Sequence, residues 1–182
     1  MRTEDRGGLK GVARTVRDVD RRLFNLLFRV KWTPLTPVMK WATRLGTAGF
    51  VWGVTAGVAF LFSGPRLVNL LVPWFAIALS WLIAEGSKYL FNRARPFLKN
   101  TEIEPLIRTP SSSSFPSGHS ATAAAGAITL SILYPLWAPL FLPGGLIIAF
   151  SRIYLGVHYP LDVLAGALIG AAVAAVLLLI FA

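Results

Sequence analysis

The chain has no cysteine, and only two histidines occur among its 182 residues. The absence of cysteine excludes disulfide bonds and thiolate metal ligands, and it removes the usual clue to the redox compartment. Charged residues are also scarce, at 14% against 55% hydrophobic residues, a balance that excludes an ordinary soluble domain. We expect no cleavable signal peptide, because the first twenty residues contain no apolar core. The composition predicts one small, helical, polytopic membrane domain.

The few charges are unevenly distributed along the chain. Residues 1–44 hold eleven Lys and Arg against four Asp and Glu, in a chain whose net charge is +10. A segment of this kind attracts either nucleic acid or anionic lipid. We expect anionic lipid as the partner, and no nucleic acid, because the segment leads directly into apolar sequence of membrane length.

The basic segment also has a helical period. Between Leu9 and Val30 apolar residues recur every three or four positions, with basic residues between them. The four charges at Arg17, Asp18, Arg21 and Arg22 argue against a bilayer crossing, so the predicted helix lies in the membrane interface. Pro34 and Pro37 follow it as helix breakers. The alternative is a solvated basic tail.

Five apolar segments follow, at 45–65, 67–84, 119–134, 136–150 and 161–182. The third and fourth belong to one run of 32 uncharged residues, too long for a single crossing and divided by Pro135, Pro139 and Pro143. The predicted fold class is all-α, a polytopic bundle of about five transmembrane helices plus the interfacial helix. We expect a basic segment at 1–44 and a transmembrane domain at 45–182.

Polar residues extend the second apolar segment. Glu85, Lys88, Asn92 and Arg95 are separated by three, four and three positions, which predicts one helix face that carries all four. Pro96 ends or bends that helix directly after Arg95.

Five crossings also fix which helix ends share a membrane surface. Four segment ends then lie at one membrane surface: the end of the second, the start of the third, the end of the fourth and the start of the fifth. Ionisable residues at such ends are costly to place and are usually functional. The residues brought together are Lys88, Arg95, His119, Arg152, His158 and Asp162.

The run Pro116-Ser117-Gly118-His119 stands at the beginning of the long uncharged stretch. A helix that begins there would direct unpaired N–H groups and the positive end of its dipole toward Ser117 and Gly118. Such a helix end binds phosphate. The alternative is an ordinary serine cap before a helix.

Three cations, two histidines and a carboxylate around a helix end suit phosphoryl transfer. The cations would stabilise charge on the phosphoryl oxygens. One histidine could attack phosphorus while the other protonates the leaving oxygen, and Asp162 would fix the tautomer of its partner ring. Taken singly, each residue can also be interpreted as having a structural role without catalysis. Lys88 could pair with Glu85, Arg95 and Arg152 could anchor helices at the interface, and Asp162 could be a first-turn acid.

Three ordered motifs carry a resemblance: Lys88-x6-Arg95-Pro96, then Pro116-Ser117-Gly118-His119, then Ser151-Arg152-x5-His158-x3-Asp162. Together they resemble the type 2 phosphatidic acid phosphatase and vanadium haloperoxidase superfamily, in its membrane-bound lipid phosphatase branch, over residues of about 81–170.

The resemblance implies Lys88, Arg95, Ser117, Gly118 and Arg152 as phosphate ligands. It implies His158 as a nucleophile that forms a phosphohistidine, His119 as the general acid and Asp162 as the partner of His158. It also implies an activity that needs no metal or other cofactor.

The expected function is therefore hydrolysis of a lipid phosphomonoester or pyrophosphate. Substrates implied by the resemblance are polyprenyl pyrophosphate, prenyl-linked sugar phosphate, phosphatidic acid and phosphatidylglycerol phosphate. The alternatives are phosphotransfer to an acceptor other than water, vanadate-dependent halide oxidation, and lipid binding without catalysis. The membrane branch usually has six crossings, whereas here an interfacial helix replaces the first. The excess of Lys and Arg on the predicted active-site face then places that face in the cytoplasm.

Overall fold

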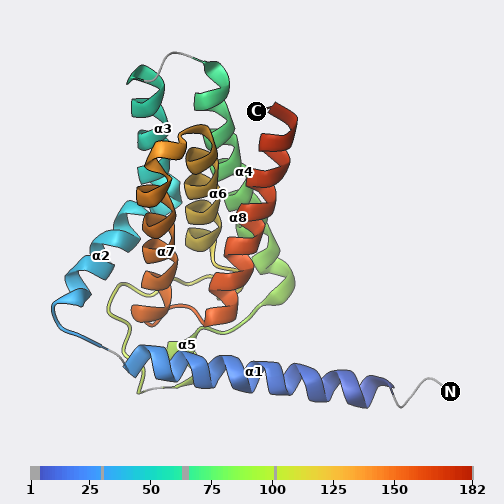
Figure 1. Ribbon diagram of the computed structural model, residues 1–182. Coiled ribbons are helices and arrows are strands. Elements are labelled where there is room, and N and C mark those ends of the chain that lie inside the picture. The colour runs from blue at the N-terminus through green and yellow to red at the C-terminus, as the bar shows by residue number, and fades with distance from the viewer. Residues whose placement is uncertain (1–4, 30, 63–65, 101, 182) are drawn as a thin grey trace.

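The computed structural model describes residues 5–29, 31–62, 66–100 and 102–181, and all regular structure in these ranges is helical (Figure 1). The α-helices are α1 (Asp5–Arg29), α2 (Leu35–Leu45), α3 (Phe50–Phe62), α4 (Leu67–Phe91), α5 (Pro96–Lys99), α6 (Gly118–Leu133), α7 (Ala138–Tyr154) and α8 (Pro160–Phe181). Short 3-10 helices, Thr47–Gly49 and Pro135–Trp137, precede α3 and α7. The predicted all-α class is confirmed. The expected segment ends at Val30, Pro65 and Ala182 lie outside the described residues.

Helix α6 forms the centre of the bundle and contacts α3, α4, α7 and α8. Its sequence consists largely of Ala, Gly, Ser and Thr, and most of its residues are buried. Small side chains let neighbouring backbones approach closely, which is how helices associate where water does not drive them together. Larger side chains, among them Trp52, Leu130 and Phe141, fill the space on one side of α6.

Two glycines of α8 set its distance from α6. A Cβ at Gly166 would lie 2.2 Å from the carbonyl oxygen of Ser117, and one at Gly170 would lie 2.1 Å from that of Ala121. Neither position has room for a side chain. The start of α8, with Asp162, is thereby held directly beside the start of α6, with Ser117.

The chain is a multi-pass membrane protein. Three helical stretches within the described ranges are long and apolar enough to cross a membrane: Leu67–Lys99, Pro135–Tyr154 and Pro160–Phe181. A fourth candidate is the pair of helical stretches Leu35–Leu45 and Thr47–Phe62, which are bent by 55° relative to each other. The pair counts as one crossing if it is a single broken span. Helix α6 has 16 residues, fewer than the roughly 20 that span a bilayer, so the five crossings stay a prediction.

The helix ends that carry the predicted site lie at one end of the bundle. The end of α4, the start of α6, the end of α7 and the start of α8 lie there, and α1 runs across them, while the C-terminus lies at the opposite end (Figure 1). This is the arrangement that the alternation of the apolar segments predicts.

The predicted N-terminal helix forms and has two unlike faces. Asp20 and Phe24 are buried against the bundle, whereas Val12, Val16 and Leu26 are exposed. An exposed apolar stripe on a basic helix is typical of helices that lie in the membrane interface.

The expectation that one face of α4 continues to Arg95 is wrong. The helix ends at Phe91, and Asn92 takes a left-handed conformation with φ of 37° that closes its last turn. Arg95 has an extended backbone, as a residue before proline prefers, and stands at the start of α5. Lys88 therefore reaches the site from a helix and Arg95 from a loop.

Substituting Gly170→Ala should lower the thermal unfolding midpoint. The added Cβ would meet the backbone of α6, so α8 would have to move away, and overpacking of this kind costs about 1–3 kcal/mol. Gly57→Ala is the matched control, because no atom of the described residues lies within 4 Å of a Cβ placed there. Melting of the purified proteins in detergent measures the difference, and equal midpoints for the two variants would contradict the close α6–α8 contact.

Candidate active site

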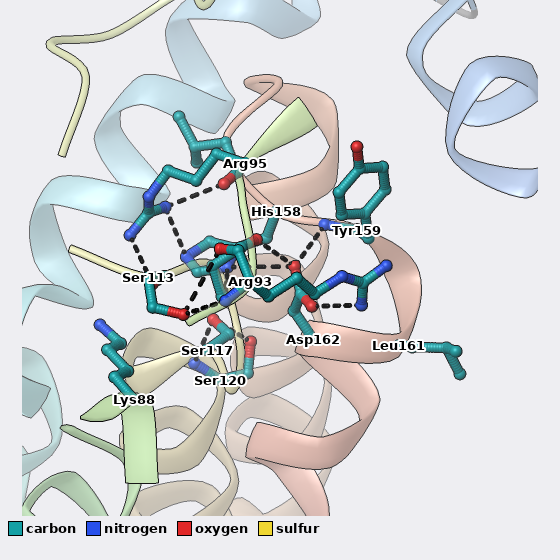
Figure 2. A network of polar contacts seen from close by, with 12 residues as sticks. Lys88, Arg93, Arg95, Ser113, Ser117, Ser120, His158, Tyr159, Leu161 and Asp162 are labelled. Carbon is teal, nitrogen blue, oxygen red and sulfur yellow. Dashed lines mark hydrogen bonds and ion pairs between the residues drawn. The ribbon is translucent and has the colours of Figure 1, made fainter. Parts of the chain in front are cut away.

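Five residues singled out by the three motifs lie close together in Figure 2: Lys88, Arg95, Ser117, His158 and Asp162. They come from segments far apart in the chain. Arg95 lies within 3.2 Å of the His158 ring, and the N–H of Ser117 donates to the carbonyl oxygen of Asp162 at 2.9 Å. The structure thus places the three motifs in one polar cluster.

The ring of His158 is buried and has a partner on each nitrogen. Nδ1 lies 2.8 Å from the carbonyl oxygen of Ser114, and Nε2 lies 3.2 Å from Nη1 of Arg95. A carbonyl can only accept and a guanidinium can only donate, so Nδ1 carries the proton and Nε2 the lone pair. Burial lowers the pKa of His158 well below its usual range, and nearby cations, first Arg152, add to the effect. The ring is therefore neutral near pH 7, with Nε2 available as a nucleophile.

Asp162 is fully buried and accepts several hydrogen bonds. Arg93 donates to Oδ1 at 2.6 Å, while Oδ2 accepts from the hydroxyl of Ser114 and, at 2.8 Å, from the N–H of Tyr159. Oδ2 lies 3.6 Å from Nδ1 of His158. The tautomer of His158 is therefore set by the carbonyl of Ser114, and not directly by Asp162 as the sequence suggested. Asp162 instead positions Ser114 and supplies negative charge beside the ring.

Lys88 and Arg95 meet at the hydroxyl of Ser112. Each donates to this oxygen at 3.3 Å, and Lys88 also forms an ion pair of 2.6 Å with Glu85. Arg95 additionally donates to the carbonyl oxygens of Ser112, Ser113 and Val157. The guanidinium thus holds the serine-rich loop against the segment before α8, and its remaining contact is with Nε2 of His158.

Arg152 and His119 line a cavity of about 390 Å³ beside α2. Arg152 is buried in the last turn of α7, where its Nη1 donates to the hydroxyl of Thr43 and its Nε has no hydrogen-bond partner among the described residues. A buried cationic donor without an acceptor is costly unless an anion completes it. The cavity can therefore take an anion between Arg152 and His119.

The start of α6 has the geometry of a capped helix. The hydroxyl of Ser117 accepts from the N–H and the hydroxyl of Ser120, at 3.4 and 2.9 Å. A Cβ at Gly118 would lie 2.7 Å from Oε1 of Glu85, so a carboxylate stands next to this positive helix end. The ordinary serine cap, one of the two alternatives from the sequence, is thus formed, and the anion site at this helix end stays a prediction.

Several residues of the cluster were missed by reasoning from sequence. The sequence analysis assigned no role to Arg93 or to the serines at 112–114. Asp20, which forms an ion pair with Arg93, was one acid in a basic segment. A signal for Asp20 did exist, because it shares a helix face with Phe24 and Leu27, away from the exposed apolar stripe.

The arrangement as a whole suits an anionic group with a tetrahedral centre. Fixed cations and a helix start surround a neutral imidazole whose lone pair faces them. Within the described residues, no three side chains of His, Asp or Glu are grouped so that they could hold a metal ion.

Comparison with known proteins identifies the family of the chain. The model of the PAP2 superfamily matches residues 69–182. An undecaprenyl-diphosphatase of Sulfolobus acidocaldarius is 33% identical over 150 residues, which are 81% of this chain and 71% of that protein.

Two solved membrane proteins share the fold. The transmembrane PAP2-type phosphatidylglycerolphosphate phosphatase of Bacillus subtilis superposes with a TM-score of 0.75 and 26% identity, over 91% of this chain and 86% of that one. LpxE of Aquifex aeolicus gives a TM-score of 0.74 and 28% identity, over 86% and 93%. The motifs, the fold and these likenesses agree, and the chain belongs to the PAP2 superfamily.

Proposed function

We propose that this membrane lipid phosphatase of the PAP2 type hydrolyses the terminal phosphate from a polyprenyl pyrophosphate through a phosphohistidine on His158. The observation that carries the proposal is the neutral His158 ring, whose Nε2 lone pair faces Arg95 at 3.2 Å in a cluster of buried cations. Phosphatases need such a nucleophile beside fixed positive charge.

The first chemical step forms a bond between Nε2 of His158 and the terminal phosphorus. The bond from phosphorus to the bridging oxygen breaks, and His119 gives a proton to that oxygen as the lipid monophosphate leaves. Lys88, Arg95 and Arg152 balance the charge on the oxygens in transfer. Water then attacks phosphorus with His119 as its base, which releases phosphate and restores the His158 lone pair.

Ser114 and Asp162 stabilise the intermediate. When Nε2 carries the phosphoryl group, the ring becomes cationic while Nδ1 still donates to the Ser114 carbonyl, 2.8 Å away. The Asp162 carboxylate, 3.6 Å from Nδ1, offsets the new positive charge.

The cavity that contains His119 and Arg152 favours a pyrophosphate over a monoester. Lys40, Arg44 and Arg108 also line it, although none of the three motifs includes them. A pyrophosphate has a second phosphate that such cations can bind once the first lies at His158. The likeness to an undecaprenyl-diphosphatase supports the same substrate class.

The catalytic end of the bundle faces the cytoplasm in this proposal. Lys and Arg residues are concentrated in α1 and in the connections at this end, whereas Arg66 lies directly before α4, whose start is at the opposite end. A surplus of basic residues marks the cytoplasmic side of membrane proteins. The orientation gives the enzyme access to lipid intermediates in the inner leaflet.

Helix α1 is proposed to rest on anionic lipid. Its exposed apolar residues can enter the interface while its basic residues attract headgroups. A cavity of about 510 Å³ beside the helix, lined in part by Arg17, Arg21 and Lys99, offers headgroup phosphates a basic recess.

His158→Ala should abolish phosphate release, by roughly 10³-fold or more, because the nucleophile is lost. His119→Ala should cost about 10²–10⁴-fold on the lipid pyrophosphate. The His119 defect should shrink on an aryl phosphate, whose leaving oxygen needs no proton, whereas the His158 defect should persist. Phosphate release by purified protein in detergent with EDTA measures both. Wild-type rates in a well-folded His158→Ala protein would overturn the mechanism.

Arg44→Gln and Arg108→Gln should each lower kcat/KM for the lipid pyrophosphate by about tenfold, because a charge-assisted contact to the second phosphate is lost. The value for the matching lipid monophosphate should hardly change. Arg66→Gln, at the opposite end of the bundle, is the control. Parallel losses on both substrates would argue that these cations do not select pyrophosphate.

The sidedness can be tested by labelling, since the chain contains no cysteine of its own. In intact cells, a membrane-impermeant maleimide should label Arg66→Cys and should leave Lys99→Cys unlabelled until the cells are permeabilised. The reverse pattern would place the active site on the outer face and would leave the chemistry unaffected.

A further inference from the structure

Arg93 joins two buried carboxylates that lie far apart in the chain. Its Nη1 donates to Oδ1 of Asp162 at 2.6 Å, and its Nη2 donates to Oδ2 of Asp20 at 2.5 Å. Both carboxylate side chains are inaccessible to solvent, and the guanidinium also lies 4.4 Å from the centre of the Tyr159 ring. Figure 2 shows Arg93 in contact with Asp162 beside His158. The guanidinium is therefore held in one place from three directions.

Asp20 has a second contact that leads to the same carboxylate. Its Oδ1 accepts from the N–H of Leu161 at 2.9 Å, and Leu161 directly precedes Asp162 in the first turn of α8. A carboxylate at a helix start also satisfies the positive end of the helix dipole. Asp20 thus restrains Asp162 twice, through the side chain of Arg93 and through the backbone of α8.

The position of Asp20 depends on how α1 docks. Phe24, one turn further along the helix, is buried with its ring centre 5.4 Å from that of Tyr159. Val16 and Val19, on another side of α1, remain exposed. One face of α1 therefore attaches to the catalytic end of the bundle while another is free to contact the membrane.

We propose that Asp20 is a positioning residue for the phosphatase reaction: through Arg93 and the first turn of α8 it fixes the Asp162 carboxylate beside His158, so that docking of α1 completes the active site. The inference rests on the proposed function. None of the three motifs contains Asp20 or assigns a role to Arg93.

Asp20→Asn tests the proposal with almost no change in shape. The variant should lose roughly 10- to 100-fold in kcat, because small displacements of supporting groups have effects of this size. KM should change little, since the groups proposed to bind phosphate are untouched. Asp18→Asn is the matched control, because Asp18 is an exposed acid on the same helix. Wild-type kcat for Asp20→Asn would overturn the proposal.

A double-mutant cycle separates positioning from general support of the fold. If Asp20 acts largely through Arg93, then Asp20→Asn should have much less effect in an Arg93→Gln protein than in the wild type. Additive losses would contradict that route. Melting of all four proteins in detergent shows whether a loss of kcat merely follows a loss of folded protein.

The acid limb of the kcat/KM profile supplies a readout that a mere loss of folded protein would not move. Among the described residues, the charged and titratable groups around His158 include Lys88, Arg95, Arg152, His119 and the carboxylate of Asp162, and neither substitution replaces any of them. Asp20→Asn removes a nearby negative charge, which disfavours the imidazolium, so the limb should shift to lower pH. Arg93→Gln removes a positive charge and should shift it to higher pH.

The outcomes separate the inference from the function on which it rests. Failure of the wild type to release phosphate from any lipid phosphate would remove both. An active wild type with an unshifted limb and unchanged kcat in Asp20→Asn would remove the positioning role alone.

Discussion

The buried carboxylate of Asp162 is the constraint on which the catalytic end depends. An ionised group without access to water has to be surrounded by donors, and here they come from Arg93, Ser114 and the backbone of Tyr159. Each donor lies in a connection between helices that has no regular secondary structure of its own. Satisfying one carboxylate therefore ties the connection after α4, the serine-rich loop and the turn before α8 into a single structure.

The same requirement fixes the orientation of His158, the proposed nucleophile. Because the hydroxyl of Ser114 is bound to Asp162, the carbonyl of that residue is held against Nδ1 of His158. The carbonyl then decides which nitrogen carries the proton. Asp162 thus acts on His158 through Ser114, which is adjacent in space. The spacing of His158 and Asp162 along the chain does not reveal this relation.

The packing of the bundle makes this arrangement possible. The small residues of α6 and the glycines of α8 bring the starts of the two helices into backbone contact, so that the N–H of Ser117 reaches the carbonyl of Asp162 at 2.9 Å. Larger residues at these positions would separate the two motifs. Close helix contact in the membrane is in this sense a condition for the chemistry at the membrane surface.

The sequence by itself determined the all-α membrane class, the amphipathic N-terminal helix, the family and the residues of the three motifs. The membrane class and the helix follow from apolar run length and helical period, which are properties of neighbouring residues. The family and the motif residues follow from the resemblance that the three ordered motifs carry. Only the tertiary structure decided that Arg95 leaves α4, that Ser114 orients His158, and that Asp20 reaches Asp162 through Arg93. These contacts join residues up to 73 positions apart, and they depend on how long side chains satisfy buried charge once the helices have packed.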